Sequence, residues 1–340
     1  MIRLSTHTNA QTSSKVFRFI AVVQLIILLG LLPGCGKKEE TNSDQLFKIS
    51  FQTDWYPQAE HGGFYQALIE GYYAAEGLEV EILPGGPNTG SKELVALGKV
   101  QFAIGKSHDV LIQASKGVPF VMAGALLQHD PQALLFHKEN PIHGFKDLDG
   151  KRIMAGTGTA FVELLRRKYQ IEFELLPLDY GLGQFLRDKT FIQQCFITSE
   201  PYYARIQGAN PGALLIKESG FDPYHVWYAR TDFALKYPEI VEKFSRASIK
   251  GWQEYLFGDR SKADALLASL NPKLDEEFIA YSVGALIEHN LVTGSTGQPT
   301  AIGQIDPERI AAEIKQLNEL GFMDGLVEVN SVLTESHFRK

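Results

Sequence analysis

Polar and aromatic residues stand directly after several predicted strands, where their side chains could hold a small planar molecule. Trp55 offers a flat apolar face for stacking on a ring, and Glu200 could accept hydrogen bonds from an exocyclic amine and a ring N–H. His61 can donate or accept a hydrogen bond near neutral pH. The candidate ligand-binding residues are Asp54, Trp55, His61, Gly85, Gly86, Lys106, Ser107, His108, Gly156, Thr157, Ser199, Glu200, Tyr202 and Trp227.

Several of these residues also have a purely structural interpretation. Trp55 could be a core aromatic, Glu200 a helix cap or ion-pair partner, and His61 a cap for the helix that follows it. Gly156-Thr-Gly-Thr could bind an anion through free backbone N–H groups at a helix start, or form a tight turn without ligand. Pro84-Gly-Gly-Pro leaves the same two alternatives, because glycine suits both turns and close approach to a ligand.

Short strands and helices alternate along the chain, which is typical of parallel strands joined by helical crossovers. Ligands of such sheets collect beyond the carboxyl ends of the strands, so the candidate residues should come together there. Strands are expected at 46–51, 78–83, 100–104, 120–127, 152–155, 173–176 and 191–198. Helices are expected over 63–76, 109–116 and 181–188, from Ser91 to Leu97, and through Lys168. From residue 238 onward only helices are expected, at 238–257, 261–270, 274–290 and 307–320, with no strand.

The first 46 residues have the pattern of an export signal followed by a tether. A basic start precedes an apolar run from Phe19 to Leu32, which is typical of a secretory signal peptide and short for a spanning helix. Leu32-Pro-Gly-Cys then resembles a bacterial lipobox, so we expect a signal peptide over 1–35 and lipid attachment at Cys35. A plain signal peptide or an N-terminal anchor helix is the alternative. The polar segment 36–46 is expected to be a solvated tether.

The remaining residues suffice for two lobes with a buried core each. We expect the first lobe at 47–131 and 227–340 and the second at 132–226, so that the chain crosses between them twice. The net charge of −7 argues against a nucleic-acid partner. Cys195, in an apolar stretch, is expected to be a buried small hydrophobic residue rather than a nucleophile, and no Cys/His cluster has the spacing of a metal site.

Six segments together carry a resemblance to a known family. They are Thr53-Asp-Trp-Tyr-Pro, His61-Gly-Gly-Phe-Tyr, Gly71-Tyr-Tyr-Ala-Ala-Glu-Gly-Leu-Glu-Val, Gly98-Lys-Val-Gln-Phe-Ala-Ile-Gly, Lys116-Gly-Val-Pro and Asp147-Leu-Asp-Gly-Lys-Arg-Ile. In order and spacing they resemble the periplasmic solute-binding proteins of ABC transporters, in the branch that binds alkanesulfonates and thiamin pyrimidine precursors. Asp54-Trp55, His61-Gly62 and Ser199-Glu200-Pro201-Tyr202 are more similar to the pyrimidine-precursor group.

The resemblance implies an α/β, two-lobed periplasmic-binding-protein fold of type II. Each lobe would be a mainly parallel sheet flanked by helices, with the C-terminal helices packed on the first lobe. It also implies a monomeric, lipid-anchored binding protein in the periplasm or on the outer face of the cytoplasmic membrane. That protein would use no cofactor, catalyse no reaction, and pass a hydroxymethyl- or formylamino-pyrimidine to an ABC permease.

Two other functions remain open. One is binding of another solute, such as an alkanesulfonate, riboflavin or an aromatic acid. The other is a pyridoxal-phosphate-dependent synthase, because fungal relatives hold that cofactor on a lysine near a histidine. Lys106 and His108 lie in the matching loop, although their spacing differs and the cysteine-rich motif of those enzymes is absent.

Overall fold

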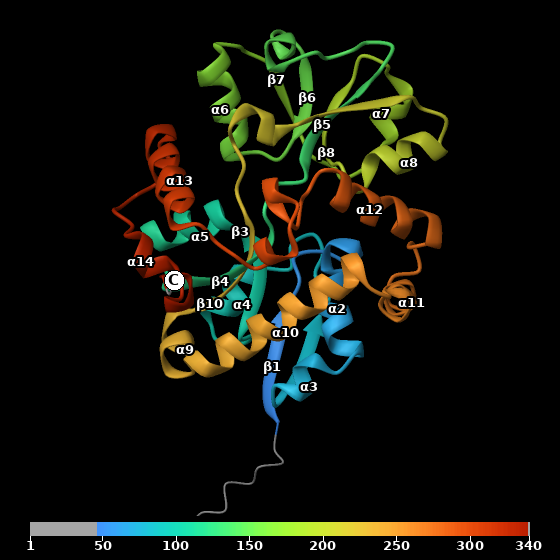
Figure 1. The fold of residues 1–340 in the computed structure, drawn as a ribbon. Coiled ribbons are helices and arrows are strands. Elements are labelled where there is room, and N and C mark those ends of the chain that lie inside the picture. Colours follow the sequence, from blue (N-terminus) through green and yellow to red (C-terminus); the bar gives the residue numbers. More distant parts are fainter. Residues whose placement is uncertain (1–45, 339–340) are drawn as a thin grey trace, which may run out of the picture. The chain divides into compact units, whose positions relative to one another are not determined.

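The computed structural model describes residues 46–338, so the signal peptide, most of the tether and the predicted lipid attachment at Cys35 lie outside the described residues. Within this part the strands form two five-stranded sheets (Figure 1). Their strand orders are β2-β1-β3-β10-β4 and β7-β6-β8-β5-β9. We call each sheet, with the helices that cover it, the first and the second lobe.

The first sheet is mixed rather than mainly parallel. β1 pairs in parallel with β2 and β3, whereas β10 is antiparallel to both β3 and β4. The physical reason is that β10 enters from the second lobe and therefore runs against its neighbours. The strands of the first sheet are β1 (Phe47–Gln52), β2 (Leu78–Leu83), β3 (Phe102–Lys106), β4 (Phe120–Leu127) and β10 (His225–Arg230).

The second sheet is mixed in the same way. β6 runs parallel to β7 and β8, and β5 lies antiparallel between β8 and β9. The sequence pattern did not predict β5, β9 or β10. The strands of the second sheet are β5 (Gln132–His137), β6 (Arg152–Ala155), β7 (Glu174–Pro177), β8 (Ile192–Phe196) and β9 (Pro211–Leu215).

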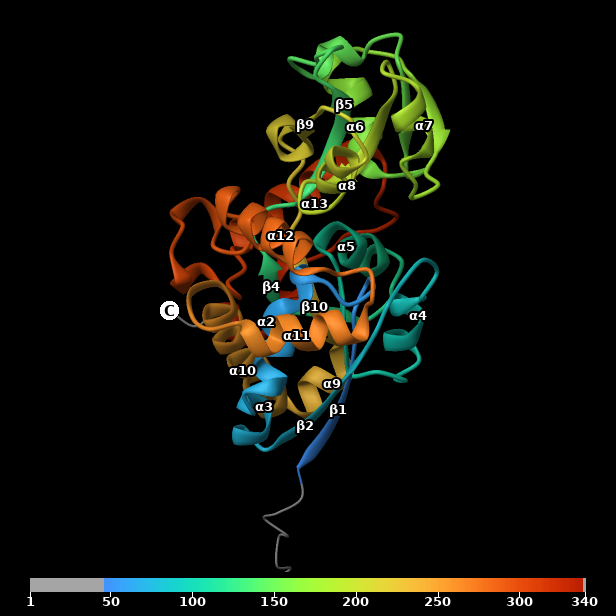
Figure 2. The same ribbon diagram turned by 90° about the vertical axis from the view of Figure 1, so that its right-hand side faces the viewer.

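Helices cover both sheets (Figures 1 and 2). The helix predicted over 63–76 is in fact two, because Gly71 adopts a left-handed conformation with φ 72° between them. The α-helices are α2 (Gly62–Ile69), α3 (Tyr72–Ala75), α4 (Ser91–Ala96), α5 (Ser107–Ser115), α6 (Ala160–Tyr169), α7 (Gly183–Arg187), α8 (Glu200–Ile206), α9 (Thr231–Lys236), α10 (Pro238–Phe257), α11 (Ser261–Leu270), α12 (Glu276–Glu288), α13 (Pro307–Leu320) and α14 (Val329–Val332). The 3-10 turns are η1 (Ala59–His61), η2 (Phe145–Leu148), η3 (Ile216–Ser219), η4 (Gly294–Thr296), η5 (Pro299–Ala301) and η6 (Glu335–Phe338).

The pair of glycines after His61 lets two long helices approach closely. α10 packs along α2, and a Cβ added at Gly62 or Gly63 would lie 2.1–2.2 Å from the rings of Tyr255 or Trp252. Core packing is dense enough that such an overlap forces shifts. The motif His61-Gly-Gly therefore serves helix packing, and the start of α2 is fixed directly behind the first strand end.

The C-terminal segment does more than pack on the first lobe. Gly303 exchanges backbone hydrogen bonds with Ala125, and Thr334 donates one to Met122, so this segment covers the outer edge of β4. α13, however, contacts both α5 of the first lobe and α6 of the second. The expectation that the C-terminal helices rest on the first lobe is therefore incomplete for α13. None of the helices within residues 46–338 is both long and apolar enough to cross a membrane.

Candidate functional site

The carboxyl ends of five strands carry the candidate residues other than Trp227, which lies within β10. In the first lobe these ends are those of β1, β2 and β3, and in the second they are those of β6 and β8. The strand ends place the predicted residues in three groups: around Asp54, around Glu200, and around Lys106. β10 begins at His225, just before the predicted lobe boundary at 227, and the division into 47–131, 132–226 and 227–340 stays a prediction.

Asp54 and His61 form a pair just beyond β1. His61 Nε2 lies 2.9 Å from Asp54 Oδ1, and the side chain of His61 is 1% exposed whereas that of Asp54 is 36% exposed. Burial raises the pKa of Asp54, but the hydrogen bond and charge of His61 outweigh it, so the pKa lies below its ordinary value. Asp54 is thus an accessible carboxylate, and His61 orients it from behind.

Trp55 faces an aromatic residue of the second lobe. Its ring centroid is 5.3 Å from that of Tyr180, with 37° between the ring planes. Tyr180 is 61% exposed and has φ 60°, a left-handed conformation that is rare for residues other than glycine and is often found at functional sites. Gln193 steadies this loop by donating to the carbonyl of Gly181 at 3.2 Å. The two rings thus form an aromatic pair across the lobes.

Glu200 opens α8 directly after β8. Its Oε2 accepts a hydrogen bond of 2.8 Å from the backbone N–H of Phe196, and within residues 46–338 no ion pair to it is recorded. Burial raises the pKa of Glu200 to about 7, although the N–H of Phe196 opposes the shift. The carboxylate thus bonds back to the end of β8, and α8 has no side-chain hydrogen bond at its N-cap, Ser199. Ser199 precedes it and donates its backbone N–H to the carbonyl of Phe196.

Lys106, at the end of β3, is held by an anionic neighbour. Its Nζ lies 3.2 Å from both carboxylate oxygens of Asp130 and 2.5 Å from Oε1 of Gln132. Asp130 is fully buried and also lies 3.2 Å from His225 Nε2. Burial raises the pKa of Asp130, but Lys106 and His225 together bring it well below its ordinary value. Lys106 is therefore a structural cation, placed where the chain passes from β4 to β5.

Ser107 and His108 contact residues outside the first two groups. The Ser107 hydroxyl donates to Glu313 and accepts from the backbone N–H of Tyr224. The ring of His108 packs beside Phe221, with 5.4 Å between ring centroids, and burial lowers its pKa to about 4. The structure therefore gives both residues contacts that hold α5, and the ligand-binding prediction for them gains no support.

The two glycine segments are engaged by neighbouring loops. Gly85 N–H donates to Thr53 Oγ1 at 2.9 Å, and a Cβ there would lie 2.3 Å from the carbonyl oxygen of Thr53. Gly86 lies against the ring of Tyr56. Gly156 donates its N–H to Gln194 Oε1 at 3.0 Å, so this backbone donor is already used, while Thr157 is exposed. The glycines thus shape the strand ends, as the turn alternative predicts.

Tyr202 and Trp227 lie in packed surroundings. Tyr202 packs against Phe278 and Tyr281 of α12. Trp227 is 0% exposed, and its Nε1 donates to Ser245 Oγ at 3.0 Å. These contacts are those of interlobe and core residues, so neither supports ligand contact in this arrangement.

Tyr180 is the clearest residue that the sequence analysis missed. It follows β7 just as Trp55 follows β1, in Asp179-Tyr180-Gly181. An aromatic residue next to glycine beyond a strand end was the available signal. Among residues 46–338 no group of histidine, cysteine and acidic side chains could hold a metal ion.

Cys195 is buried in β8, as predicted, and 2% exposed. Burial, together with the charge of Glu200, raises the pKa of its thiol well above the ordinary value. Since the thiolate is the reactive form, we expect alkylation of Cys195 by iodoacetamide to be slow in native protein and fast in denaturant. Mass spectrometry of the two samples measures the difference, and equal rates would contradict the buried position.

The sequence and the fold both have known relatives. The family described as NMT1/THI5 like matches residues 58–257, which is more than half of the chain. A formylaminopyrimidine-binding protein of Halalkalibacterium halodurans is 29% identical over 130 residues, 38% of this chain and 39% of that protein. A 4-amino-5-hydroxymethyl-2-methylpyrimidine phosphate synthase of Schizosaccharomyces pombe is 33% identical over 133 residues, 39% of this chain and 38% of the enzyme. The chain thus spans about two fifths of the length of these two relatives.

Among solved structures, the periplasmic aliphatic sulphonate binding protein SsuA of Escherichia coli is similar with a TM-score of 0.65. The match covers 84% of this chain and 91% of that one at 14% identity. At this identity the likeness shows the fold alone. The described residues have the two-lobed periplasmic-binding-protein fold, with mixed sheets and flanking helices.

Proposed function

Because the chain belongs to the NMT1/THI5-like family, we propose that it binds an amino-substituted pyrimidine for import into the cell. The ligand would be a hydroxymethyl- or formylamino-pyrimidine that serves as a thiamin precursor. The observation that carries the proposal is the presence of two partly buried carboxylates, Asp54 and Glu200, and of the aromatic pair Trp55–Tyr180 beyond the strand ends.

Each part of such a ligand has a partner in this set. A planar ring stacks on Trp55 or Tyr180, and the two N–H groups of the exocyclic amine donate to Asp54 or Glu200. A buried carboxylate that loses its donor is left unsatisfied, so the site should reject analogues without the amine. The name of the Halalkalibacterium relative agrees with this ligand class.

An alkanesulfonate fits the site less well. Binding of a sulfonate usually requires cationic or backbone N–H donors. Arg205 lies over the ring of Tyr281, Arg230 is paired with Asp232, and the N–H of Gly156 is taken by Gln194. The carboxylates of Asp54 and Glu200 would also repel an anion.

A pyridoxal-phosphate-dependent synthase is the second candidate, since the Schizosaccharomyces relative is named a 4-amino-5-hydroxymethyl-2-methylpyrimidine phosphate synthase. The residues do not fit that cofactor. A nucleophilic lysine usually stands in an apolar pocket or beside another cation, whereas Lys106 is paired with Asp130. The sequence contains two cysteines, Cys35 and Cys195, and so lacks the cysteine-rich motif. We therefore propose a binding protein without catalytic activity.

We also propose that the protein is exported as a monomer and anchored by lipid on Cys35, in the periplasm or on the outer face of the cytoplasmic membrane. There it would deliver its ligand to an ABC permease. The lipobox-like Leu32-Pro-Gly-Cys and the polar segment 36–46 support this proposal.

The ligand class is tested by calorimetric titration of ligand-stripped protein. The panel contains hydroxymethylpyrimidine, formylaminopyrimidine, thiamin, riboflavin and taurine. We expect tight binding of one of the two precursors and no binding of taurine. Tight binding of riboflavin or taurine without any response to the precursors would refute the proposed ligand, and a pyridoxal absorbance band in purified protein would favour the synthase.

A further inference from the structure

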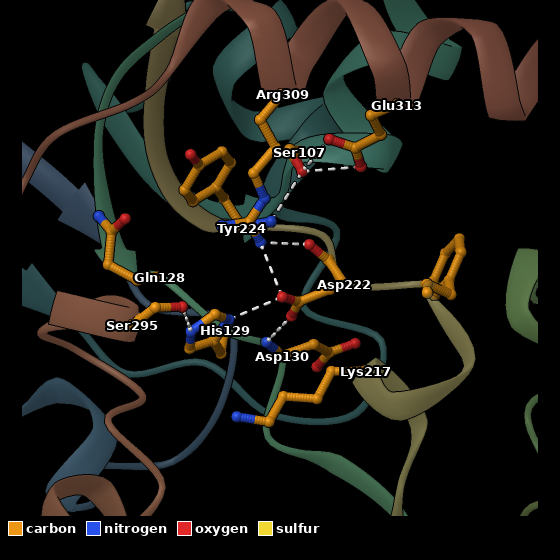
Figure 3. Close-up of polar contacts among 12 residues, drawn as sticks. Ser107, Gln128, His129, Asp130, Lys217, Asp222, Tyr224, Ser295, Arg309 and Glu313 are labelled. Atoms are coloured by element: carbon orange, nitrogen blue, oxygen red, sulfur yellow. Dashed lines mark hydrogen bonds and ion pairs between the residues drawn. The ribbon is translucent and has the colours of Figure 1, made fainter.

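The two segments that join the lobes are tied to one another by a single carboxylate. Asp222 lies in the segment 220–224, and its Oδ1 accepts a hydrogen bond of 2.8 Å from the backbone N–H of Asp130 in the segment 128–131. Its Oδ2 lies 2.6 Å from Nδ1 of His129, whose Nε2 is in turn 3.3 Å from Ser295 Oγ (Figure 3). The hinge is therefore a pair of segments joined by hydrogen bonds rather than two independent linkers.

Helix α13 contacts the segment 220–224 of this hinge through Arg309. Arg309 lies 3.2 Å from the Asp222 carboxylate, donates to the Asp222 carbonyl, and has its guanidinium 3.8 Å from the ring centroid of Tyr224. Figure 3 shows Arg309 and Glu313 reaching from the same helix toward Asp222 and Ser107. Asp222 thus accepts donors from both the first crossing and α13.

The same helix is also bonded to each lobe. On the first lobe, Ser107 Oγ lies 2.8 Å from both carboxylate oxygens of Glu313. On the second lobe, Arg167 donates to the carbonyl of Glu319 at 2.9 Å. Ile310 and Leu317 add apolar contacts, because they belong to a core cluster that contains residues of both α5 and α6. One helix therefore has polar contacts to the first lobe, the hinge and the second lobe.

We propose that α13 is a strap that limits how far the two lobes separate, and that its contacts thereby set ligand affinity without touching the ligand. The strap contacts occur together with the 5.3 Å approach of Trp55 and Tyr180 across the lobes. The strap contacts therefore belong to an arrangement in which the lobes are close. Moving the lobes apart must stretch at least one of these contacts. Loosening the strap should shift the population toward separated lobes. The proposal does not depend on the identity of the ligand.

The test measures the distance between the lobes in ligand-free protein. Spin labels are placed on L97C in the first lobe and E172C in the second, both exposed positions, while buried Cys195 stays unlabelled. Arg309→Gln removes the contacts of α13 with Asp222 and Tyr224, and Arg167→Gln removes its hydrogen bond to the second lobe. The matched control is Arg246→Gln, an exposed arginine whose ion pair with Glu76 lies within the first lobe.

We expect both strap variants to shift the distance distribution to longer values, while Arg246→Gln matches the wild type. With formylaminopyrimidine as the probe, strap variants should bind about three- to tenfold more weakly, since the arrangement with close lobes is less populated. Distributions that coincide with the wild type in both variants, or that shift to shorter distances, would overturn the strap. If no pyrimidine binds at all, the proposed ligand fails, but the distance measurement still decides on the strap.

Discussion

Replacing Glu200 by alanine is expected to weaken binding of the amino-pyrimidine on the order of a hundredfold. The carboxylate has no cationic partner among the described residues and can accept two donors from the ligand, and hydrogen bonds to charged groups are worth about 1.5–3 kcal/mol each. Glu200→Gln should lose less, roughly tenfold, because its amide NH₂ turns one acceptor into a donor. Calorimetric titration measures both losses.

The pH dependence distinguishes this role from a helix cap. Burial raises the pKa of Glu200 to about 7 in the free protein, and the ligand binds the ionised form. Affinity should therefore rise as the pH increases from 6 to 8 and then level off, and Glu200→Gln should abolish this rise. Glu172→Gln, at an exposed glutamate of the same lobe, is the control. Unchanged affinity in Glu200→Ala with a lowered melting temperature would make Glu200 a cap alone.

Replacing Trp55 by alanine is expected to weaken binding by about 1–3 kcal/mol, roughly five- to 150-fold, which is the scale of stacking between a base and an aromatic side chain. Thermal stability should change little, because Trp55 is only partly buried. Tyr180→Ala should act in the same direction, and Trp55→Phe should retain part of the affinity. Titration with thermal unfolding separates the effects, and full affinity with a collapsed melting temperature would place Trp55 in the core.

The aromatic pair also sets a condition for binding. A ring held between two others needs about 3.5 Å on each side, hence about 7 Å between the outer rings. The rings of Trp55 and Tyr180 are 5.3 Å apart. The ligand therefore stacks on a free face of one ring, or the lobes separate before it enters.

The sequence predicted those parts of the site that depend on residues close to one another in the chain. Asp54 and Trp55 follow a strand whose period is visible, and Glu200 follows another, so the strand-end rule found all three. Tyr180 obeys the same rule but follows the short strand β7, which shows no clear strand period. The contact of Ser107 with Glu313 joins residues 206 positions apart, and no local pattern reports such a contact.

The elements of the fold also divide into those that a local pattern predicts and those that depend on tertiary pairing. β4 was predicted because its apolar run is buried on both faces. β10 and β5 were missed because their insertion against parallel neighbours is decided by tertiary pairing. The helix expected over 63–76 is interrupted at Gly71, whose φ of 72° ends the first helix. The apolar spacing continues past this residue and so did not reveal the break.

The position of β10 has a consequence for the order of folding. β10 lies between β3 and β4, two strands that are consecutive in the chain. Their sheet therefore stays divided until residues 225–230 have been synthesised, after every strand of the second sheet. The second lobe can form from a continuous stretch, whereas the first must wait for long-range pairing, which is slow. A nascent chain thus keeps its first lobe unfinished until the second is complete, and an incomplete lobe would favour the export that we propose.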